Sequence, residues 1–257
     1  MTDARAATAG AVGTPDGGRE IVVAMRDVHR HYQMGDSVVR ALDGVSFAIE
    51  RGSYWAIMGP SGSGKSTLLN LLGCLDRPTT GAYLLGGLDV SRLSDDQLSE
   101  ERSIKLGFVF QSFQLIQQLS VLENVEVPLF YQGIAPAVSK VRAKEALERV
   151  GLGDRLHHRP NELSGGQQQR AAVARALVNQ PIVLLADEPT GNLDSKTAKE
   201  ILDLFDQLHA QGSTIILVTH DPGVASRAEW VLRVLDGKVD RVEAGGRNRS
   251  GTTGARA

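Results

Sequence analysis

Short apolar runs recur along this chain and predict strands that are buried on both faces of a sheet. The run at 182–186 is typical, because it offers no polar face to solvent. Turn residues such as Asp43-Gly44 and Arg51-Gly52 separate some of the runs. We expect strands at 21–25, 45–49, 54–58, 106–110, 182–186, 214–219 and 230–235.

Apolar residues spaced by three or four positions predict helices between these strands. In segment 138–150 the spaced residues are Ala143, Ala146, Leu147 and Val150. Leucines lie on nearly every side of segment 65–75, so we expect that helix to be buried between two layers. The predicted helices are 65–75, 97–104, 121–131, 138–150, 164–179 and 195–211, and a short helix follows Asp221.

The order of these elements predicts one domain with an insertion. Strands and helices alternate in the last third of the chain, which is typical of an α/β fold with a parallel sheet. Residues from about 88 to 161 are mostly helical in pattern, and we interpret them as a helical subdomain inserted into an α/β core. Residues 1–19 and 245–257 are small, polar and aperiodic, so we expect disordered tails beside a domain at 20–244.

Composition excludes several classes of function. The 28 Lys and Arg residues nearly balance the 30 Asp and Glu residues, so no overall basic field points to nucleic acid. Cys74 is the single cysteine, which excludes an intramolecular disulfide and a cysteine-based zinc site. No apolar stretch approaches the roughly 18 residues that span a bilayer, and the first residues lack the apolar core of a secretion signal. We therefore expect any membrane role to depend on a partner.

A phosphate-binding pattern lies between the predicted strand 54–58 and the predicted helix 65–75. It reads Gly59-Pro60-Ser61-Gly62-Ser63-Gly64-Lys65-Ser66-Thr67. The glycines let backbone N–H groups turn toward phosphate oxygens, and the helix start adds a positive dipole end. Lys65 supplies charge for the β and γ phosphates, and the Ser66 hydroxyl is a ligand for Mg²⁺. The pattern predicts a nucleoside triphosphate site.

Two acidic residues follow the predicted strand 182–186, at the sheet edge where open α/β folds bind ligands. Asp187 is the natural holder of Mg²⁺ beside Ser66, either directly or through another ligand of the ion. Glu188 comes next, in position to orient and deprotonate an attacking water. An acidic pair at a strand end is often only a turn signal, and the phosphate loop is what favours the catalytic interpretation.

Three more residues join this predicted site. Gln111 follows the strand 106–110 and points to the metal or the water. His220 follows the strand 214–219 in the same sheet and is a donor for the γ phosphate, although a lone histidine there is more often structural. Asp194 caps the helix that begins near residue 195, and we expect it to serve the site as well.

A serine followed by two glycines opens the predicted helix 164–179. The segment reads Leu163-Ser164-Gly165-Gly166-Gln167. It offers a hydroxyl and free backbone N–H groups at the positive end of a helix, a surface that suits a γ phosphate. We expect the intervening subdomain to hold it away from its own phosphate loop. The simplest geometry is a head-to-tail homodimer with two ATP molecules between the copies.

With these motifs in place, the chain resembles the ATP-binding subunit of an ABC transporter from about residue 21 to residue 242. The resemblance implies an α/β fold, the P-loop NTPase ABC cassette, with a mixed sheet core, an antiparallel β subdomain and an inserted α-helical subdomain. It also implies ATP hydrolysis with ATP and Mg²⁺ as cofactors.

The resemblance assigns roles to matching residues. Catalysis falls to Glu188, His220 and Gln111, and the metal ligands are Ser66, Gln111 and Asp187. Tyr32 becomes the aromatic residue that stacks on adenine, with His29 and His31 as alternative rings. The other nucleotide-binding residues are Gly59, Pro60, Ser61, Gly62, Ser63, Gly64, Lys65, Ser66, Thr67, Ser164, Gly165, Gly166, Gln167 and Asp194.

Three segments, 73–81, 108–113 and 119–125, are similar to the lipoprotein-release and macrolide-export (LolD/MacB-like) branch. That similarity implies a separate membrane permease of the FtsX/MacB-like type and a cytoplasmic location at the inner face of the cell membrane. We expect the permease to dock near Phe113, Leu115 and Ile116, unless these residues only pack the subdomain.

Two other classes of function also use an ABC cassette. A cell-division-type regulator that moves a membrane partner without transport carries the same motifs, and the sequence does not separate it from an exporter. A soluble ABC protein acting on DNA or ribosomes is disfavoured. Lys65 and Ser164 are too close in sequence for a long coiled coil between them, and the chain carries one cassette rather than two.

Overall fold

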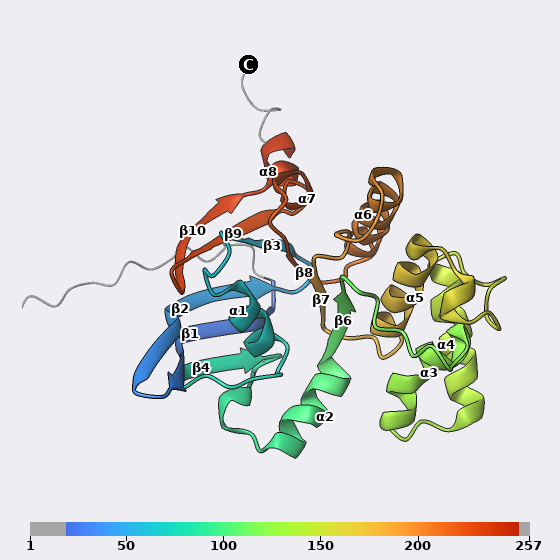
Figure 1. Cartoon of the computed structure of the whole chain (residues 1–257), viewed down its shortest axis with the longest axis horizontal. Coiled ribbons are helices and arrows are strands. Elements are labelled where there is room, and N and C mark those ends of the chain that lie inside the picture. The colour runs from blue at the N-terminus through green and yellow to red at the C-terminus, as the bar shows by residue number, and fades with distance from the viewer. Residues whose placement is uncertain (1–18, 252–257) are drawn as a thin grey trace, which may run out of the picture.

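A mixed sheet forms the centre of the computed structural model, which describes residues 19–251 (Figure 1). Its strand order is β10-β9-β3-β8-β7-β6, and all neighbours are parallel except β10 and β9. The strands are β3 (Tyr54–Met58), β6 (Leu106–Phe110), β7 (Val183–Asp187), β8 (Ile215–Val218), β9 (Trp230–Leu235) and β10 (Lys238–Ala244). The predicted buried parallel sheet is confirmed, and β10 adds an antiparallel edge that was not predicted.

An antiparallel sheet with the order β2-β1-β4-β5 lies beside it. Its strands are β1 (Ile21–Met34), β2 (Ser37–Glu50), β4 (Thr80–Leu85) and β5 (Leu88–Asp89). The apolar pattern of the sequence predicted only residues 21–25 of β1 and 45–49 of β2, which are the inner ends of these strands. Beyond those ends the two strands pair as a ribbon of mixed exposure, so their sequence carries no long apolar run.

Alternate residues of β3 divide the protein into two cores. Tyr54, Ala56 and Met58 pack with helices α5 (Gly165–Leu177) and α6 (Ser195–Ala210) on one face. Trp55 and Ile57 pack on the other face with α1 (Lys65–Leu72) and the antiparallel sheet. Helices α1 and α5 therefore lie on opposite faces of the mixed sheet (Figure 1).

Helix α1 is buried between two layers, as predicted, but it is shorter than predicted. Its leucines, Leu68, Leu69, Leu71 and Leu72, are all buried. The helix ends at Gly73, where a Cβ would lie 2.7 Å from the Phe108 ring, and Cys74 then takes a positive φ of 52°.

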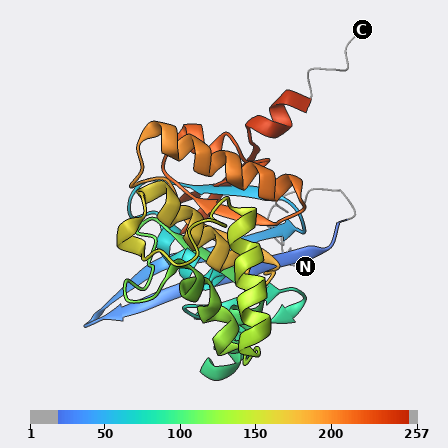
Figure 2. The same ribbon diagram turned by 90° about the vertical axis from the view of Figure 1, so that its right-hand side faces the viewer.

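The helical region is smaller than the predicted insertion of 88–161. Helices α3 (Val121–Tyr131) and α4 (Pro136–Arg149) pack on α5 and share its core (Figure 2). In contrast, β5 pairs with β4, and β6 pairs with β7 in the mixed sheet. Helix α2 (Asp95–Lys105) buries Leu98 in the core of the antiparallel sheet. The first part of the predicted insertion therefore belongs to the two sheets.

The predicted tail from residue 245 is ordered at its start. A short helix, α7 (Pro222–Ala225), precedes β9, and α8 (Gly246–Gly251) follows β10. Arg247 forms an ion pair with Asp206 of α6, and the Asn248 side chain donates to the Glu229 carbonyl at 3.0 Å. The remaining parts of the predicted tails 1–19 and 245–257, residues 1–18 and 252–257, lie outside the described residues.

Across residues 19–251, no helix combines the length and the apolar character needed to cross a membrane.

Asn124 stabilises the loop between β6 and α3 through side-chain hydrogen bonds. Its side chain is fully buried and donates to the carbonyls of Ile116, Leu119 and Ser120 at 2.9–3.2 Å. Its Oδ1 accepts the Ile116 N–H at 2.7 Å. One side chain thus replaces the backbone partners that a regular element would supply.

We expect Asn124→Leu to lower the free energy of unfolding by about 2–4 kcal/mol, because it leaves buried backbone groups unpaired. Denaturant unfolding measures this. Gln118→Leu, an exposed change in the same loop, is the control and should stay within about 0.5 kcal/mol of the parent. Equal stability of the two variants would show that Asn124 does not hold the loop.

Candidate active site

The loop from Gly59 to Gly64 joins β3 to α1 and requires glycine for two reasons. Gly62 and Gly64 have φ values of 78° and 100°, a backbone conformation that side chains disfavour. A Cβ on Gly59 would lie 2.2 Å from the Val234 carbonyl, and one on Gly64 would lie 2.5 Å from the Ala41 carbonyl. The loop is therefore pressed against β9 and β2, which hold its N–H groups in a fixed direction.

A cavity of about 420 Å³ opens at this loop, a size in the range of small-molecule sites. It is lined by Val39, Arg40, Ala41, Ser61, Gly62, Gly64, Lys65, Ser66, Thr67, Asp236 and Gly237. Of these, the sequence predicted only the loop residues. The residues from β2 and from the β9–β10 turn were missed, although an Asp-Gly pair between two strand patterns is a strong hairpin signal.

Lys65 and Ser63 show that the loop is suited to an anion. Lys65 Nζ donates to the carbonyls of Gly59 and Pro60, both at 2.8 Å, so its charge lies over the loop. The Ser63 hydroxyl is buried and has no partner among the described residues. An anion on this loop would receive the charge of Lys65 and the free N–H groups at the start of α1.

Glu188 and His220 meet at the ends of β7 and β8. Glu188 has a φ of 44°, a strained conformation that is common at functional sites. Its Oε1 accepts the His220 N–H at 3.0 Å and lies 2.6 Å from His220 Nδ1, while its Oε2 accepts the Thr219 hydroxyl at 3.1 Å. The His220 ring is 78% exposed, whereas Glu188 is 21% exposed. The hydrogen bond to Glu188 raises the pKa of His220.

Asp187 lies at the end of β7, close enough to Lys65 and Glu188 for their charges to act on it. Burial raises the pKa of Asp187, Glu188 raises it further, and Lys65 opposes both effects. A cation beside Asp187 would favour its ionised form. The carboxylate and the Ser66 hydroxyl are the oxygen donors that Mg²⁺ prefers, so these residues fit the predicted ion.

The side chain of Gln111 contacts Asn192. Its Nε2 donates to Asn192 Oδ1, and Asn192 Nδ2 donates to the Gln111 carbonyl, both at 3.1 Å. A Cβ on Gly191 would lie 2.5 Å from Gln111 Nε2. The structure thus brings Gln111 to the 191–194 segment, and its predicted contact with a metal or water stays a prediction.

Tyr32 lies outside the lining of the cavity, whereas its cross-strand partner Val39 lines it. The Arg30 guanidinium lies 4.4 Å from the centre of the Tyr32 ring, and the Tyr32 hydroxyl donates to Asp76 at 2.7 Å. Arg30 also forms an ion pair with Asp76 at 2.8 Å. The stacking of Tyr32 on adenine stays a prediction.

Ser164 caps α5 and is exposed, with Gln167 completing a capping box at 3.0 and 3.3 Å. The N–H groups of Gly165 and Gly166 have no acceptor within the helix. Because α5 and α1 lie on opposite faces of the sheet, Ser164 does not reach the cavity of its own chain.

The start of α5 is pressed against the start of α6. A Cβ on Gly166 would lie 2.4 Å from Thr197 Cγ2. Asp194 caps α6 by accepting the N–H groups of Lys196 and Thr197, both at 3.1 Å, which confirms its predicted capping role. Its role toward a nucleotide stays a prediction.

Gln169 is a functional candidate that the sequence did not reveal. It is fully buried in α5, and its Nε2 donates to the carbonyls of Pro189 at 2.6 Å and Phe110 at 3.3 Å. These carbonyls adjoin Glu188 and Gln111 in the chain. The only signal in the sequence is a polar residue on an otherwise apolar helix face.

Comparison with known proteins yields close matches. Residues 42–191 match the family model described as ABC transporter. An uncharacterized ABC transporter ATP-binding protein of Thermotoga maritima is 55% identical over 225 residues, which cover 88% of this chain and 96% of that protein. The macrolide export ATP-binding/permease protein MacB of Hyphomonas neptunium is 54% identical over 218 residues. This match covers 85% of the chain but only 34% of MacB, so the chain spans about a third of that relative.

Solved structures match the fold as well. The bacterial ABC transporter cassette MJ0796, in a dimeric structure, is 45% identical with a TM-score of 0.78, over 86% of this chain and 98% of that one. A second dimeric structure of MJ0796, in a post-hydrolysis state with ADP and phosphate bound, matches equally well.

We expect the pKa of His220 to lie above its ordinary value of about 6.5 and to fall toward it in Glu188→Gln, which removes the negative partner. Histidine NMR titration measures both values, and Glu200→Gln, an exposed change on α6, is the control. Folding raises this pKa, so the contact stabilises the fold below about pH 6.5 and is lost as the pH rises through the folded-state pKa. An unchanged pKa in Glu188→Gln would rule out this pairing in solution.

Proposed function

Because the chain belongs to the ABC transporter family and, as one of its ATP-binding subunits, is an ATP hydrolase, we propose that it works as a head-to-tail homodimer. Each of two ATP molecules is gripped by the phosphate loop of one copy and by the start of α5 of the other. The opposite placement of α1 and α5 carries this proposal, since one chain cannot bring both surfaces to one nucleotide. The dimeric structures of MJ0796 support it.

Different residues of the chain carry out different parts of ATP binding and hydrolysis. The N–H groups of the loop and Lys65 bind the phosphates, while Ser66 and Asp187 would hold Mg²⁺, which would offset the charge on the phosphate oxygens. Glu188 orients the attacking water and accepts its proton. His220, held by Glu188 at 2.6 Å, is placed to donate to the γ phosphate when its ring turns to the nucleotide.

The proposed partner is a membrane permease. We propose that a cytoplasmic helix of this permease docks in a groove of about 990 Å³ between α2, β6, α3 and α5. Its apolar lining includes Leu75, Phe108, Val127, Tyr131, Ile134 and Ala176. An amphipathic helix fits such a groove. This docking places the chain at the inner face of the membrane.

The sequence placed this groove near Phe113, Leu115 and Ile116, with packing of the subdomain as the alternative. Leu115 is buried in the core and Phe113 packs against it, so for these two residues packing is what the structure shows. The groove connects to them through Arg175. This residue lines the groove and donates to the carbonyls of Phe113 and Gln114 at 3.0 and 2.6 Å.

That connection gives the docked helix a route to the nucleotide. Movement of Arg175 shifts the loop that carries Gln111, and Gln111 holds Asn192 beside the cap of α6. We propose the lipoprotein-release or macrolide-export type of coupling to an FtsX/MacB-like permease, which the identity to MacB supports.

We expect Glu188→Gln to bind ATP and to elute as a dimer with ATP, while its hydrolysis rate falls at least about a hundredfold. Adding Ser164→Arg should return this variant to a monomer without loss of ATP affinity, because the bulky cation lies on the surface offered to the partner copy. Size-exclusion chromatography with light scattering measures the dimer, and Glu162→Arg, an exposed change near α5, is the control. A double variant that stays dimeric would refute the shared site.

We expect Tyr131→Glu to weaken membrane association of the chain at least about tenfold and to leave ATP hydrolysis by the free chain unchanged. A carboxylate in an apolar interface costs well over the 1.4 kcal/mol that a tenfold change requires. Tyr131 is highly exposed, so the substitution should not affect folding. Sedimentation of the chain with cell membranes measures the effect, and Tyr131→Phe is the control. Full membrane association of Tyr131→Glu would exclude this groove as the dock.

A further inference from the structure

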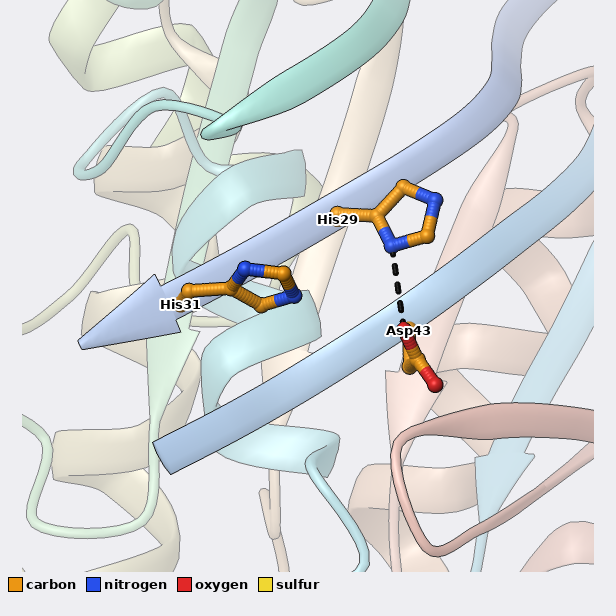
Figure 3. Close-up of side chains that lie close together, drawn as sticks. All are labelled: His29, His31 and Asp43. Atoms are coloured by element: carbon orange, nitrogen blue, oxygen red, sulfur yellow. Dashed lines mark hydrogen bonds and ion pairs between the residues drawn. The ribbon is translucent and has the colours of Figure 1, made fainter. Parts of the chain in front are cut away.

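Two histidines of β1 and one aspartate of β2 gather on the antiparallel sheet (Figure 3). His29, His31 and Asp43 each offer one donor atom, and these atoms all lie within 4.8 Å of one another. His29 and Asp43 are direct cross-strand partners, with 3.1 Å between Nδ1 and Oδ1. His31 lies two residues beyond His29 and therefore on the same side of the strand, with the ring centres 5.7 Å apart.

The free nitrogen of His31 marks this cluster as unusual. His31 Nε2 is buried and has no hydrogen-bond partner among the described residues. A buried polar atom without a partner is costly, and native structures rarely leave one without a reason. In Figure 3 the ring of His31 points toward the pair formed by His29 and Asp43. A ligand between the three side chains would satisfy this nitrogen.

We propose that His29, His31 and Asp43 form a binding site for a divalent transition-metal ion such as Zn²⁺ or Ni²⁺. Two imidazoles and a carboxylate are common ligands for these ions, whereas Mg²⁺ prefers oxygen donors alone. Two ligands that each lie about 2.1 Å from a metal are roughly 3.0–3.4 Å apart, close to the separation of His29 Nδ1 and Asp43 Oδ1. The His31 donor atom lies within 4.8 Å of the other two, so His31 completes the set after a small movement of its side chain, and water fills the remaining positions.

The neighbours of the cluster suit this role. Asp27 Oδ1 lies 3.2 Å from His29 Nε2, the outer ring nitrogen. A carboxylate on that nitrogen keeps its proton there and leaves the lone pair of Nδ1 for a metal, an arrangement typical of metal-binding histidines. Lys238 lies 3.3 Å from Asp43 Oδ2 and thus holds the other oxygen, leaving Oδ1 to the ion.

The site is separate from the nucleotide cavity but shares its wall. The Asp43 N–H donates to the Gly237 carbonyl at 2.8 Å, and the Gly237 N–H donates to the Ser63 carbonyl at 2.9 Å. A metal ion at the cluster would therefore link β1 to β2. Two hydrogen bonds, through Gly237, would connect this link to the phosphate loop.

Calorimetric titration of the tag-free full chain with Zn²⁺ and with Ni²⁺, in excess Mg²⁺ and without nucleotide, tests the site. We expect one ion to bind per chain, and His31→Gln and Asp43→Asn each to weaken binding at least about tenfold. His157→Gln and His220→Gln remove histidines outside the cluster and should bind like the parent. Thermal unfolding in the presence of a chelator checks that all variants fold.

Three results would overturn the proposal. They are the lack of saturable binding, unchanged affinity in folded His31→Gln and Asp43→Asn, and a loss of binding that appears only in His157→Gln or His220→Gln.

Discussion

The protein depends on close backbone packing around the phosphate loop. The carbonyl of Val234 in β9 and that of Ala41 in β2 approach Gly59 and Gly64 so closely that a side chain would collide with either. Gly237 adds a hydrogen bond from the β9–β10 turn to the loop. Both sheets thus converge on one segment and fix its backbone conformation, which we expect to direct its N–H groups toward a bound phosphate. Such preorganisation lowers the cost of binding an anion.

The sequence predicted the elements that carry a continuous apolar run or a helical spacing of apolar residues, and it missed strands that carry neither. The bounds of β3, β6, β9 and α3 match the predicted ranges, because continuous apolar runs or a capping serine define them. In contrast, β4, β10 and the outer halves of β1 and β2 expose many of their residues, so neither an apolar run nor a clear alternation marks them. The predicted insertion was too wide for the same reason, since local pattern does not reveal which sheet a strand joins.

The candidate site was predictable wherever a motif lies at the end of an element. Asp187, Glu188 and His220 follow adjacent parallel strands, so their meeting at one edge follows from the topology alone. Gln111 with Asn192, Tyr32 with Arg30 and Asp76, and buried Gln169 could not be predicted in the same way. Apart from the contact between the near neighbours Tyr32 and Arg30, each of these contacts joins segments far apart in the sequence, and only the packed structure determines the distance.

The tight contact between Gly166 and Thr197 has a mechanical consequence. Helices α5 and α6 are in close contact at Gly166 and Thr197. Gln169 of α5 also forms hydrogen bonds to the residues next to Glu188 and Gln111. We infer that the two helices and these flanking residues move together as one rigid block. In the homodimer that we propose, such a block would separate from the partner copy as a unit and would transmit force by tilting.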